Sequence, residues 1–499
     1  MDKKAVFAHI LFMTAAALLR VYLSFHLDLI NYPDTETYEL FALESVNGLA
    51  HSMPTRPLGY PVFLSIVYRI MGAAREHAVW VQHALGVLSY PLFYSVLRRL
   101  FKGRLFPALF AFAITVSGPM IIYERAILSD FLNHFFLLVS FRLALGYFES
   151  RRAFLMAPLA LFSFAAVSTR PTSVIFVFAL LAYFALKLVR GTIAKEPMLA
   201  TLKGPAVYIG VYLVLSIASG QLALRAVGGK GEPVGVLGVT MLIRTADSID
   251  YGSPLHRDVK EGYREYLKVY LPDYVPEYAN FVAAYRLMTG FECRMTDETK
   301  ERYALVAENS ARFYVPKHIG PNTFTTNDIL REARCDMGTV EAVFLEVAQE
   351  AVFSDPMGFS ASFARNLQGF IEVKPWEKGA FGKLLEGRPA PFARAYMLVN
   401  KSIDDLLSAR AVSVAFTILF AASSIAFLIA GRRSAGYTAG LFLASFIVLN
   451  YLALGVLADH PANRYKLPFW WMQGPLIVSF LMSLASVKRA SSGRSEWTS

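Results

Sequence analysis

Charged residues are scarce in this sequence: Asp, Glu, Lys and Arg make up only 17% of its 499 residues. A soluble domain of this size would carry roughly a quarter. Hydrophobic residues reach 55%, the mean hydropathy is +0.42, and the apolar residues gather in runs close to the ~20 residues that cross a bilayer. This composition excludes a soluble globular protein and predicts a polytopic membrane protein.

Acidic residues are fewer than basic ones, 38 against 49, so the formal net charge is +11. A surplus of this size can indicate nucleic-acid binding. However, the Lys and Arg residues gather in short loops between apolar runs, which is the positive-inside pattern that orients membrane spans. The basic surplus therefore predicts membrane topology rather than a phosphate-reading surface.

Other features are also missing. The first apolar run is too long, and too poor in a small-residue cleavage site, for a removed signal peptide. The GGKG run at 228–231 lacks the strand, the spacing and the Ser or Thr of a phosphate-cradling loop, so it predicts a linker.

No internal repeat is evident. Only two cysteines are present, Cys293 and Cys335, and two buried thiols are as compatible with the sequence as a disulfide.

The apolar runs predict ten spans, with both termini in the cytoplasm. The expected spans are 5–27, 77–97, 105–122, 127–147, 153–168, 172–190, 204–224, 411–430, 436–456 and 467–486. The apolar run at 60–73 is short, and if it crossed the membrane most basic clusters would face outward, against the positive-inside rule. We therefore predict that it lies at the interface, which places the basic clusters inside with Lys3 and Lys4.

This topology predicts three parts. They are an N-terminal transmembrane module at 1–224 with a first outer loop at 28–76, an extracytoplasmic and mainly helical domain at 225–410, and C-terminal spans with a cytoplasmic tail at 411–499. The stretch at 339–353 has a helical pattern within the outer domain. The predicted fold class is thus an all-α polytopic membrane protein of about ten helices.

Two carboxylates, Asp34 and Glu36, open the first outer loop directly after the first span. Asp34 stands at the expected start of a helix that runs to Asn47, with Gly48 as its stop. An ordinary cap explains Asp34, and a favourable dipole contact suits Glu36, so both acids have a structural explanation beside a catalytic one.

The motif RPLGYP follows at 56–61, where two prolines and a glycine fix a bent loop. Arg56 is either a snorkelling interfacial cation or a phosphate clamp, for which a planar guanidinium is well suited.

Further charges fall at the outer ends of other spans. YERAILSDF at 123–131 brings Glu124 and Asp130 to the start of the fourth span, where an unpaired acid is costly. Arg170 precedes Pro171 between the fifth and sixth spans. The loop before the last span supplies His460, Arg464, Tyr465 and Lys466. A solvated turn would explain any one of these charged segments. All of them are expected on the same side of the membrane, and this favours a functional site.

These motifs together resemble the GT-C superfamily of membrane glycosyltransferases, in its protein-mannosyltransferase and lipid A aminoarabinose-transferase branch. The resemblance rests on Asp34 and Glu36 with Tyr38 and Ala42, on R-P-x-G-Y-P, on Asp130, on Arg170-Pro171, and on the late R-Y-x-x-P of Arg464, Tyr465 and Pro468. It covers residues 1–190 well and the last spans more loosely. Many relatives have adjacent Asp and Glu in the first loop, whereas Thr35 separates the two acids in this chain.

The resemblance implies an enzyme of the bacterial cytoplasmic membrane with its active site on the extracytoplasmic face. It would move one sugar, with inversion, from a polyprenyl-phosphate donor to a hydroxyl of a lipid, glycan or protein acceptor. The implied catalytic residues are Asp34, Glu36 and Asp130, with Asp34 as the base. The implied phosphate-binding residues are Arg56, Arg170, His460, Arg464 and Lys466. The implied substrate-binding residues are Tyr38, Tyr60, Glu124 and Tyr465.

Several alternatives stay open at this level. A divalent cation such as Mg²⁺ or Mn²⁺ would suit carboxylate ligands, but relatives differ in metal use, so the cofactor is unknown. An oligosaccharide ligase or polymerase would have a similar fold. A transporter would require charged residues near the middle of several spans. Most charges of this chain lie at span ends, which favours the enzyme.

Overall fold

The computed structural model describes residues 3–30, 32, 34–46, 57–101, 103–193, 198–226, 237–271, 279, 283, 337–371, 389–408 and 442–450. Within these ranges every regular element is a helix, and the only extended pairing is a single bridge between Ile30 and Ala126. The predicted all-α class is confirmed for this part of the chain. Cys293 and Cys335 lie outside the described residues.

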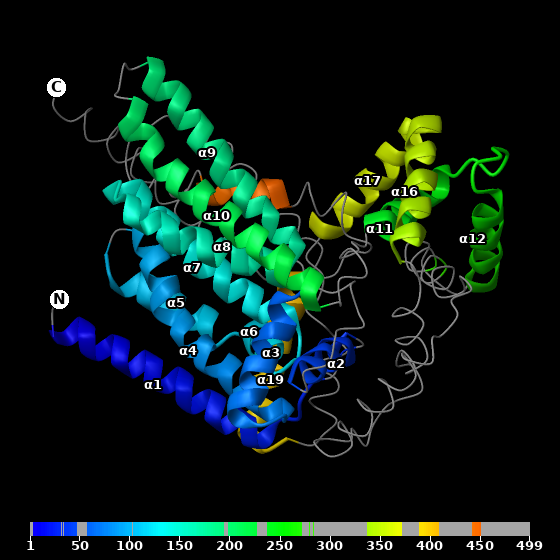
Figure 1. Ribbon diagram of the computed structural model, residues 1–499. Helices are drawn as coiled ribbons and strands as arrows, with labels where there is room; N and C mark the ends of the chain where they lie inside the picture. Colours follow the sequence, from blue (N-terminus) through cyan, green and yellow to red (C-terminus); the bar gives the residue numbers. More distant parts are fainter. Residues whose placement is uncertain are drawn as a thin grey trace, which may run out of the picture.

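The helices of the N-terminal module form one bundle (Figure 1). The long ones are α1 (Lys3–His26), α4 (Arg75–Leu100), α7 (Ser129–Ser150), α8 (Met156–Thr169), α9 (Val174–Ile193) and α10 (Met198–Ala226). Among the described residues, three helical stretches are long and apolar enough to cross a membrane, Val6–His26, Ser129–Ser150 and Leu202–Gln221, and a bent pair of helices would make a fourth. The count of ten spans stays a prediction, because most of the C-terminal ranges lie outside the described residues.

Helix α7 is the centre of the bundle, and α1 and α10 lie at its edge. Within the most apolar window of each helix, 72% of the residues are buried in α7, against 17% in α1 and 11% in α10. Phe131 and Phe141 of α7 are fully buried, whereas Phe7 and Phe25 of α1 are exposed. An exposed apolar face is stable only against lipid, so these two edge helices have the character of lipid-facing spans.

The span expected at 105–122 is not one continuous helix. It consists of α5 (Leu105–Thr115) and α6 (Gly118–Glu124), which are bent by 45° at the break. The apolar run predicts the length of this segment as one span, although Gly118-Pro119 directly after Ser117 is a helix-breaking pair that could have indicated the break. Packing from distant elements holds the bend, as described below.

The apolar run at 60–73 forms α3 (Gly59–Met71), a helix of 13 residues. It is well short of the ~20 residues that cross a bilayer. The helix packs on α2 (Thr35–Val46), α4 and α8. Its predicted place at the membrane interface agrees with this length and stays a prediction.

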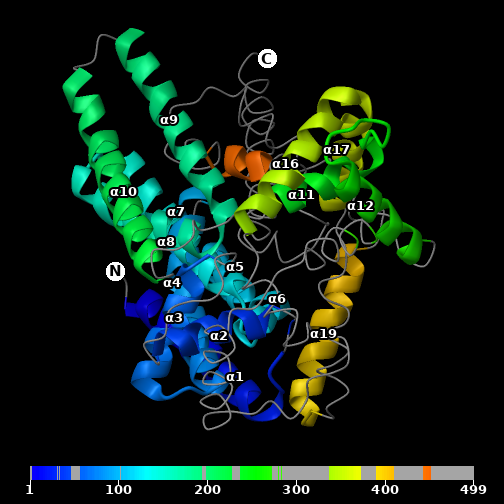
Figure 2. The same ribbon diagram turned by 45° about the vertical axis from the view of Figure 1, so that its right-hand side comes forward.

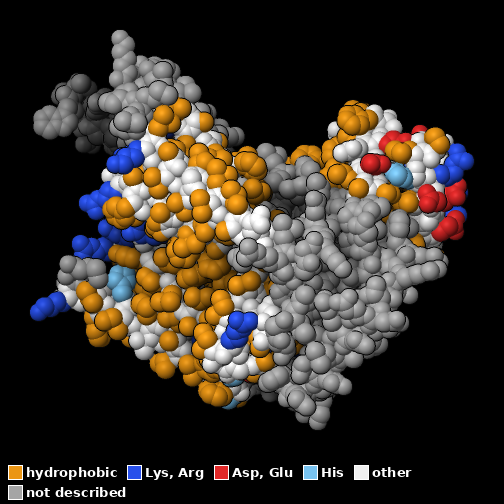
Figure 3. Space-filling view, in the orientation of Figure 1, with side chains coloured by type: hydrophobic (Ala, Val, Ile, Leu, Met, Phe, Trp, Pro, Cys, Tyr) orange, Lys and Arg blue, Asp and Glu red, His pale blue; other side chains and the backbone are white. Residues whose placement is uncertain are grey.

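Basic side chains gather at one end of the bundle. Lys3 begins α1, Arg98 and Arg99 end α4, and Arg151 and Arg152 follow α7. Figure 3 shows Lys and Arg along the edge where the N-terminus and the α4–α5 and α7–α8 connections lie. This is the end that the positive-inside rule predicts to be cytoplasmic. Since α1 starts at this end and α7 finishes there, Asp34 and Asp130 lie at the opposite end.

The outer region forms a second group of helices beside the bundle (Figures 1 and 2). It comprises α11 (Leu237–Thr245), α12 (Arg257–Tyr270), α16 (Met337–Ser354) and α17 (Pro356–Ile371) around a core of its own that contains Leu242, Tyr263 and Phe344. Helix α16 contains the stretch predicted to be helical. Helix α19 (Pro391–Ser408) differs, because it packs against α6 of the bundle.

Candidate active site

The segment that leaves α1 lies along the segment that joins α6 to α7. The backbone N–H of Ile30 donates to the carbonyl oxygen of Arg125 at 3.3 Å, next to the bridge between Ile30 and Ala126. In return, the Arg125 guanidinium donates to the carbonyl oxygens of Leu27 and Asp28. A cation at the carboxyl end of α1 also compensates the helix dipole. Arg125 therefore ties the start of the first outer loop to the start of α7.

Two side chains of α2 continue this contact. The Thr35 hydroxyl donates to the carbonyl oxygen of Ile127 at 3.3 Å, and the Tyr38 hydroxyl lies 3.1 Å from Ser129 Oγ. Thr35, Tyr38 and Ser129 are buried, so these bonds exclude water. The start of α2 is thereby held beside the start of α7, whose second residue is Asp130.

Asp34 stands at the amino end of α2, as the sequence predicts. Helix α2 begins at the next residue, and the Asp34 carbonyl oxygen accepts the backbone N–H of Tyr38 at 3.3 Å. Its side chain is half-buried rather than enclosed. Glu36 falls in the first turn of the helix, but its side chain lies outside the described residues. Asp34 directly precedes Thr35, whose hydroxyl bonds the segment before α7.

Helix α2 is fixed from its other side by an ion pair. Arg75, at the start of α4, pairs with Glu39, with Nε at 2.7 Å from Oε1. Tyr68 of α3 donates to the same oxygen at 3.2 Å. Arg75 is 4% exposed, so its charge depends on this partner. Asp34 consequently stands at the start of a helix that other elements hold on both sides.

Asp130 forms an ion pair with Arg170, so these two residues lie together. The Asp130 side chain is 3% exposed and that of Arg170 is 14% exposed. Asp130 belongs to the first turn of α7, and Arg170 follows the last residue of α8. The Arg170 charge offsets the cost of burying the Asp130 carboxylate. The guanidinium, in turn, is held in one orientation while part of it stays accessible.

The glycine of the motif R-P-x-G-Y-P lies where two helices approach each other closely. A Cβ on Gly59 would lie 2.7 Å from backbone atoms of Ser168 and Thr169, the residues just before Arg170. The first turn of α3 thus touches the end of α8 without an intervening side chain. The next residue, Tyr60, is fully buried, lies edge-on to Tyr38 at 5.1 Å, and contacts Gln82 at 3.3 Å.

We expect Gly59→Ala to lower stability by roughly 1–3 kcal/mol, because the added methyl group meets backbone that cannot rotate away. It should also displace Arg170 and lower any activity of the site. Gly210→Ala is the matched control, since nothing lies within 4 Å of that position in α10. Thermal unfolding in detergent checks both variants. Equal midpoints for the two would show that the close approach at Gly59 is not tight.

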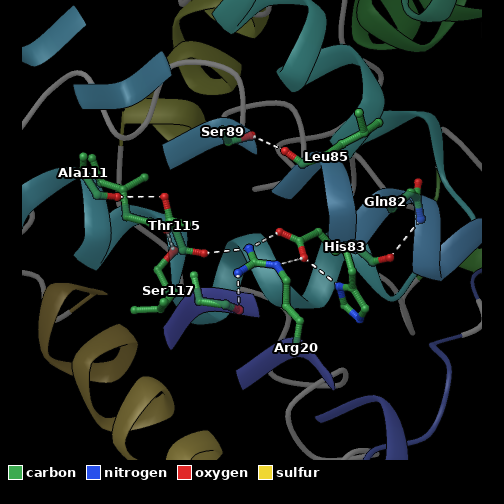
Figure 4. Close-up of polar contacts among 12 residues, drawn as sticks. Arg20, Gln82, His83, Leu85, Ser89, Ala111, Thr115 and Ser117 are labelled. Atoms are coloured by element: carbon green, nitrogen blue, oxygen red, sulfur yellow. Dashed lines mark hydrogen bonds and ion pairs between the residues drawn. The ribbon is translucent and has the colours of Figure 1, made fainter. Parts of the chain in front are cut away.

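Glu124 is fully buried and already has two side-chain partners, Arg20 and His83, which Figure 4 labels. Arg20 of α1 binds both carboxylate oxygens, with Nη2 at 2.6 Å from Oε1 and Nε at 2.7 Å from Oε2. His83 Nδ1 lies 2.7 Å from Oε2. Gly86 makes room for the pair, because a Cβ there would lie 2.2 Å from Oε1. A direct contact of Glu124 with substrate would require it to give up one of these partners.

Sequence reasoning did not select Arg20, His83, Gln82 or Arg125 as site residues. Arg20 lies inside the first apolar run, and a charged residue in a span is a signal that could have identified it. Gln82 and His83 are polar residues in the middle of the expected second span, which is the same signal in weaker form. Their partners could not be inferred, since they lie more than 40 residues away.

Five predicted site residues lie outside the described residues: Arg56, His460, Arg464, Tyr465 and Lys466. In the part of the chain that the structure describes, no group of three His, Cys, Asp or Glu side chains could hold a metal ion. The described residues therefore do not decide whether the protein binds Mg²⁺ or Mn²⁺, which the sequence left open.

No family model and no curated protein matches this sequence. Solved structures do match the fold. One is the oligosaccharyltransferase AglB from Archaeoglobus fulgidus in complex with an inhibitory peptide and a dolichol-phosphate, with a TM-score of 0.44, 13% identity, and coverage of 97% of this chain and 52% of that one. Another is ArnT from Cupriavidus metallidurans bound to undecaprenyl phosphate, with a TM-score of 0.33, 11% identity, and coverage of 89% and 76%.

Both are GT-C membrane glycosyltransferases. This is the superfamily that the sequence motifs resemble. The chain spans about half the length of AglB. At these identities and TM-scores, no residue role and no reaction follows from the matches, so the function is argued from the residues of this chain.

Proposed function

We propose that this protein is a GT-C-type glycosyltransferase that moves a single sugar from a polyprenyl-phosphate donor to an acceptor hydroxyl. The observation that carries the proposal is that the start of α2, where Asp34 stands, is held beside the start of α7, where Asp130 pairs with Arg170. Three helix ends, those of α2, α7 and α8, bring an accessible carboxylate and an oriented guanidinium to one end of an apolar bundle. That end lies opposite the basic clusters, so the proposed active site is extracytoplasmic.

The proposed reaction needs a base, and Asp34 has that role. The Asp34 carboxylate takes the proton of the acceptor hydroxyl as its oxygen attacks the anomeric carbon of the donor sugar. The bond between that carbon and the phosphate oxygen breaks, and its electron pair leaves with the lipid phosphate. Attack from the opposite face inverts the configuration. A positioned carboxylate contributes about 10²–10⁴-fold to such a step.

The leaving phosphate needs positive charge, and Arg170 supplies it in this proposal. The charge on the phosphate oxygen increases in the transition state, and a cation fixed beforehand stabilises it without reorganisation. Asp130 keeps Arg170 in place through the ion pair. Arg56, Arg464, His460 and Lys466 complete the proposed phosphate site. Tyr38 and Tyr465 contact the sugar or acceptor in this proposal, whereas the fully buried Tyr60 and Glu124 support the elements that form the site.

The test is a transfer assay with the purified protein in lipid nanodiscs, using a panel of polyprenyl-phosphate sugars and of lipid, glycan and peptide acceptors. Arg170→Lys keeps a charge beside Asp130 but loses the planar fork, so we expect turnover to fall roughly tenfold or more while the protein still folds. Arg152→Lys, an exposed position at the opposite end, is the control. Equal turnover of both variants would contradict the role of Arg170.

The same assay separates the alternatives. Transfer only from a lipid-linked oligosaccharide would favour a ligase or polymerase. The buried Arg20, Glu124 and His83 are the kind of intramembrane charges that a transporter uses. They pair with one another, however, and Arg20 binds both oxygens of Glu124. Solute uptake into proteoliposomes without any transfer would support the transporter and overturn the proposed enzyme.

A further inference from the structure

The break between α5 and α6 leaves backbone groups that their own helices cannot satisfy. The N–H groups of Val116 and Ser117 still bond α5, but the carbonyl oxygens of Thr115 and Val116 and the N–H of Gly118 are bonded by side chains of other elements. Ser117, at the start of α6, makes no side-chain cap bond to the helix. In an apolar environment such groups need partners from neighbouring elements.

Helix α19 supplies partners on both sides of the break. The Tyr396 hydroxyl donates to the carbonyl oxygen of Val116 at 2.7 Å. The backbone N–H of Gly118 donates to Asn400 Oδ1 at 2.6 Å. These two residues lie one turn apart on α19, so they face the break together. The contact joins positions about 280 residues apart in the chain.

The contact is closely fitted. A Cβ on Gly118 would lie 2.9 Å from Cβ of Asn400, so only glycine allows the two backbones to approach this far. Asn400 Nδ2 donates to the Tyr396 carbonyl oxygen at 2.9 Å, which fixes the orientation of the amide. On the same helix Ala393 and Met397 are fully buried. This is the packing of a docked helix rather than of a passing loop.

The bend held by α19 leads directly to the candidate site. Helix α6 has only seven residues and ends at Glu124, and Arg125 then holds the end of α1. Arg20 binds Glu124 at one end of α6 and donates to the Thr115 carbonyl oxygen, at 2.9 Å, on the other side of the break. A change in the bend therefore moves the segment that places Asp130.

We propose that Tyr396 and Asn400 are positioning residues, through which α19 fixes the α5–α6 bend and thereby sets the place of Asp130 and Arg170. Helix α19, at the C-terminal end of the outer region, then belongs to the catalytic module. The catalytic consequence rests on the proposed function, whereas the effect on the bend does not.

Asn400→Leu removes the acceptor of the Gly118 N–H at similar side-chain size. We expect kcat for sugar transfer to fall about tenfold, with the donor KM changed by less than about twofold, because geometry is lost and binding is kept. Asn400→Asp restores the acceptor and should recover most of the turnover. Ser402→Leu, an exposed position on the same helix, is the matched control. If Asn400→Leu does not fold, Tyr396→Phe, which removes one hydroxyl from the same contact, tests the positioning role instead.

Hydrogen exchange of the intact protein provides a readout independent of activity. In Asn400→Leu the amides of residues 118–128 should exchange about tenfold faster than in the wild type, while those in the middle of α7 should not change. Faster exchange in a protein without any transfer activity would support the positioning contact and overturn the proposed function instead. Unchanged exchange, or an Asn400→Asp variant as slow in transfer as Asn400→Leu, would overturn the positioning role.

Discussion

Asp34→Asn should abolish sugar transfer and leave the protein folded. The amide cannot take a proton at neutral pH, so the step loses its base and turnover should fall by about 10²–10⁴-fold. Asn is also as good as Asp at the start of a helix, so α2 should still begin at Thr35. The measurement is initial-rate transfer per folded enzyme, with folding checked by thermal unfolding in nanodiscs.

Asp28→Asn is the matched control for this variant. Asp28 is an exposed acid of the same outer segment, six residues earlier. Its contact with Arg125 uses the backbone carbonyl, which the substitution keeps. We expect near-normal transfer in this control. Near-normal turnover in Asp34→Asn itself would remove Asp34 as the base, and equal losses in both variants would indicate a general effect of charge at this surface.

Glu124→Gln should be the most destabilising substitution in the bundle. Arg20 and Glu124 are 2% and 0% exposed at their side chains, so neutralising Glu124 leaves the Arg20 charge buried without compensation. Removing one partner of a buried pair costs roughly 3–5 kcal/mol. Because Arg20 also spans the α5–α6 break, the loss should loosen α6. Unfolding followed by denaturant titration in mixed micelles measures the effect.

Two comparisons make this prediction specific. Glu149 also pairs with an arginine, Arg99 at 2.7 Å, but its side chain is 38% exposed, so Glu149→Gln should cost less than about 1 kcal/mol. The double variant Arg20→Met with Glu124→Gln should recover part of the loss, as expected for a coupled pair. Purely additive losses, or equal effects at Glu124 and Glu149, would show that the buried pair is not the source of the stability.

The candidate site could be predicted from the sequence to the extent that local signals mark it. An acid directly after an apolar run predicted Asp34 at the start of a helix, and an acid in the first turn of a span predicted Asp130. The Arg-Pro pair marked the end of α8, and the structure brings Arg170 onto Asp130. These residues could be found because each lies where a hydropathy change and a charge coincide.

The residues that hold the site were not predictable in the same way. The Arg20–Glu124 pair spans 104 positions, and the contact between Tyr38 and Ser129 spans 91. No local pattern connects such distant positions. The bend between α5 and α6 has a local signal in Gly118-Pro119, but the groups that stabilise it could not be predicted, since they come from α1 and α19.

The sequence alone determined the class of protein, the helical ranges of the N-terminal module and the side of the bundle on which its acids lie. Patterns of hydropathy and charge extend over one or two helical turns, so they can be recognised in the sequence. Only the tertiary structure decided which charges meet, which groups hold the break between α5 and α6, and that α19 belongs to the bundle. Those outcomes depend on buried polar groups finding partners across the fold, and that requirement can be met only by residues brought together in space.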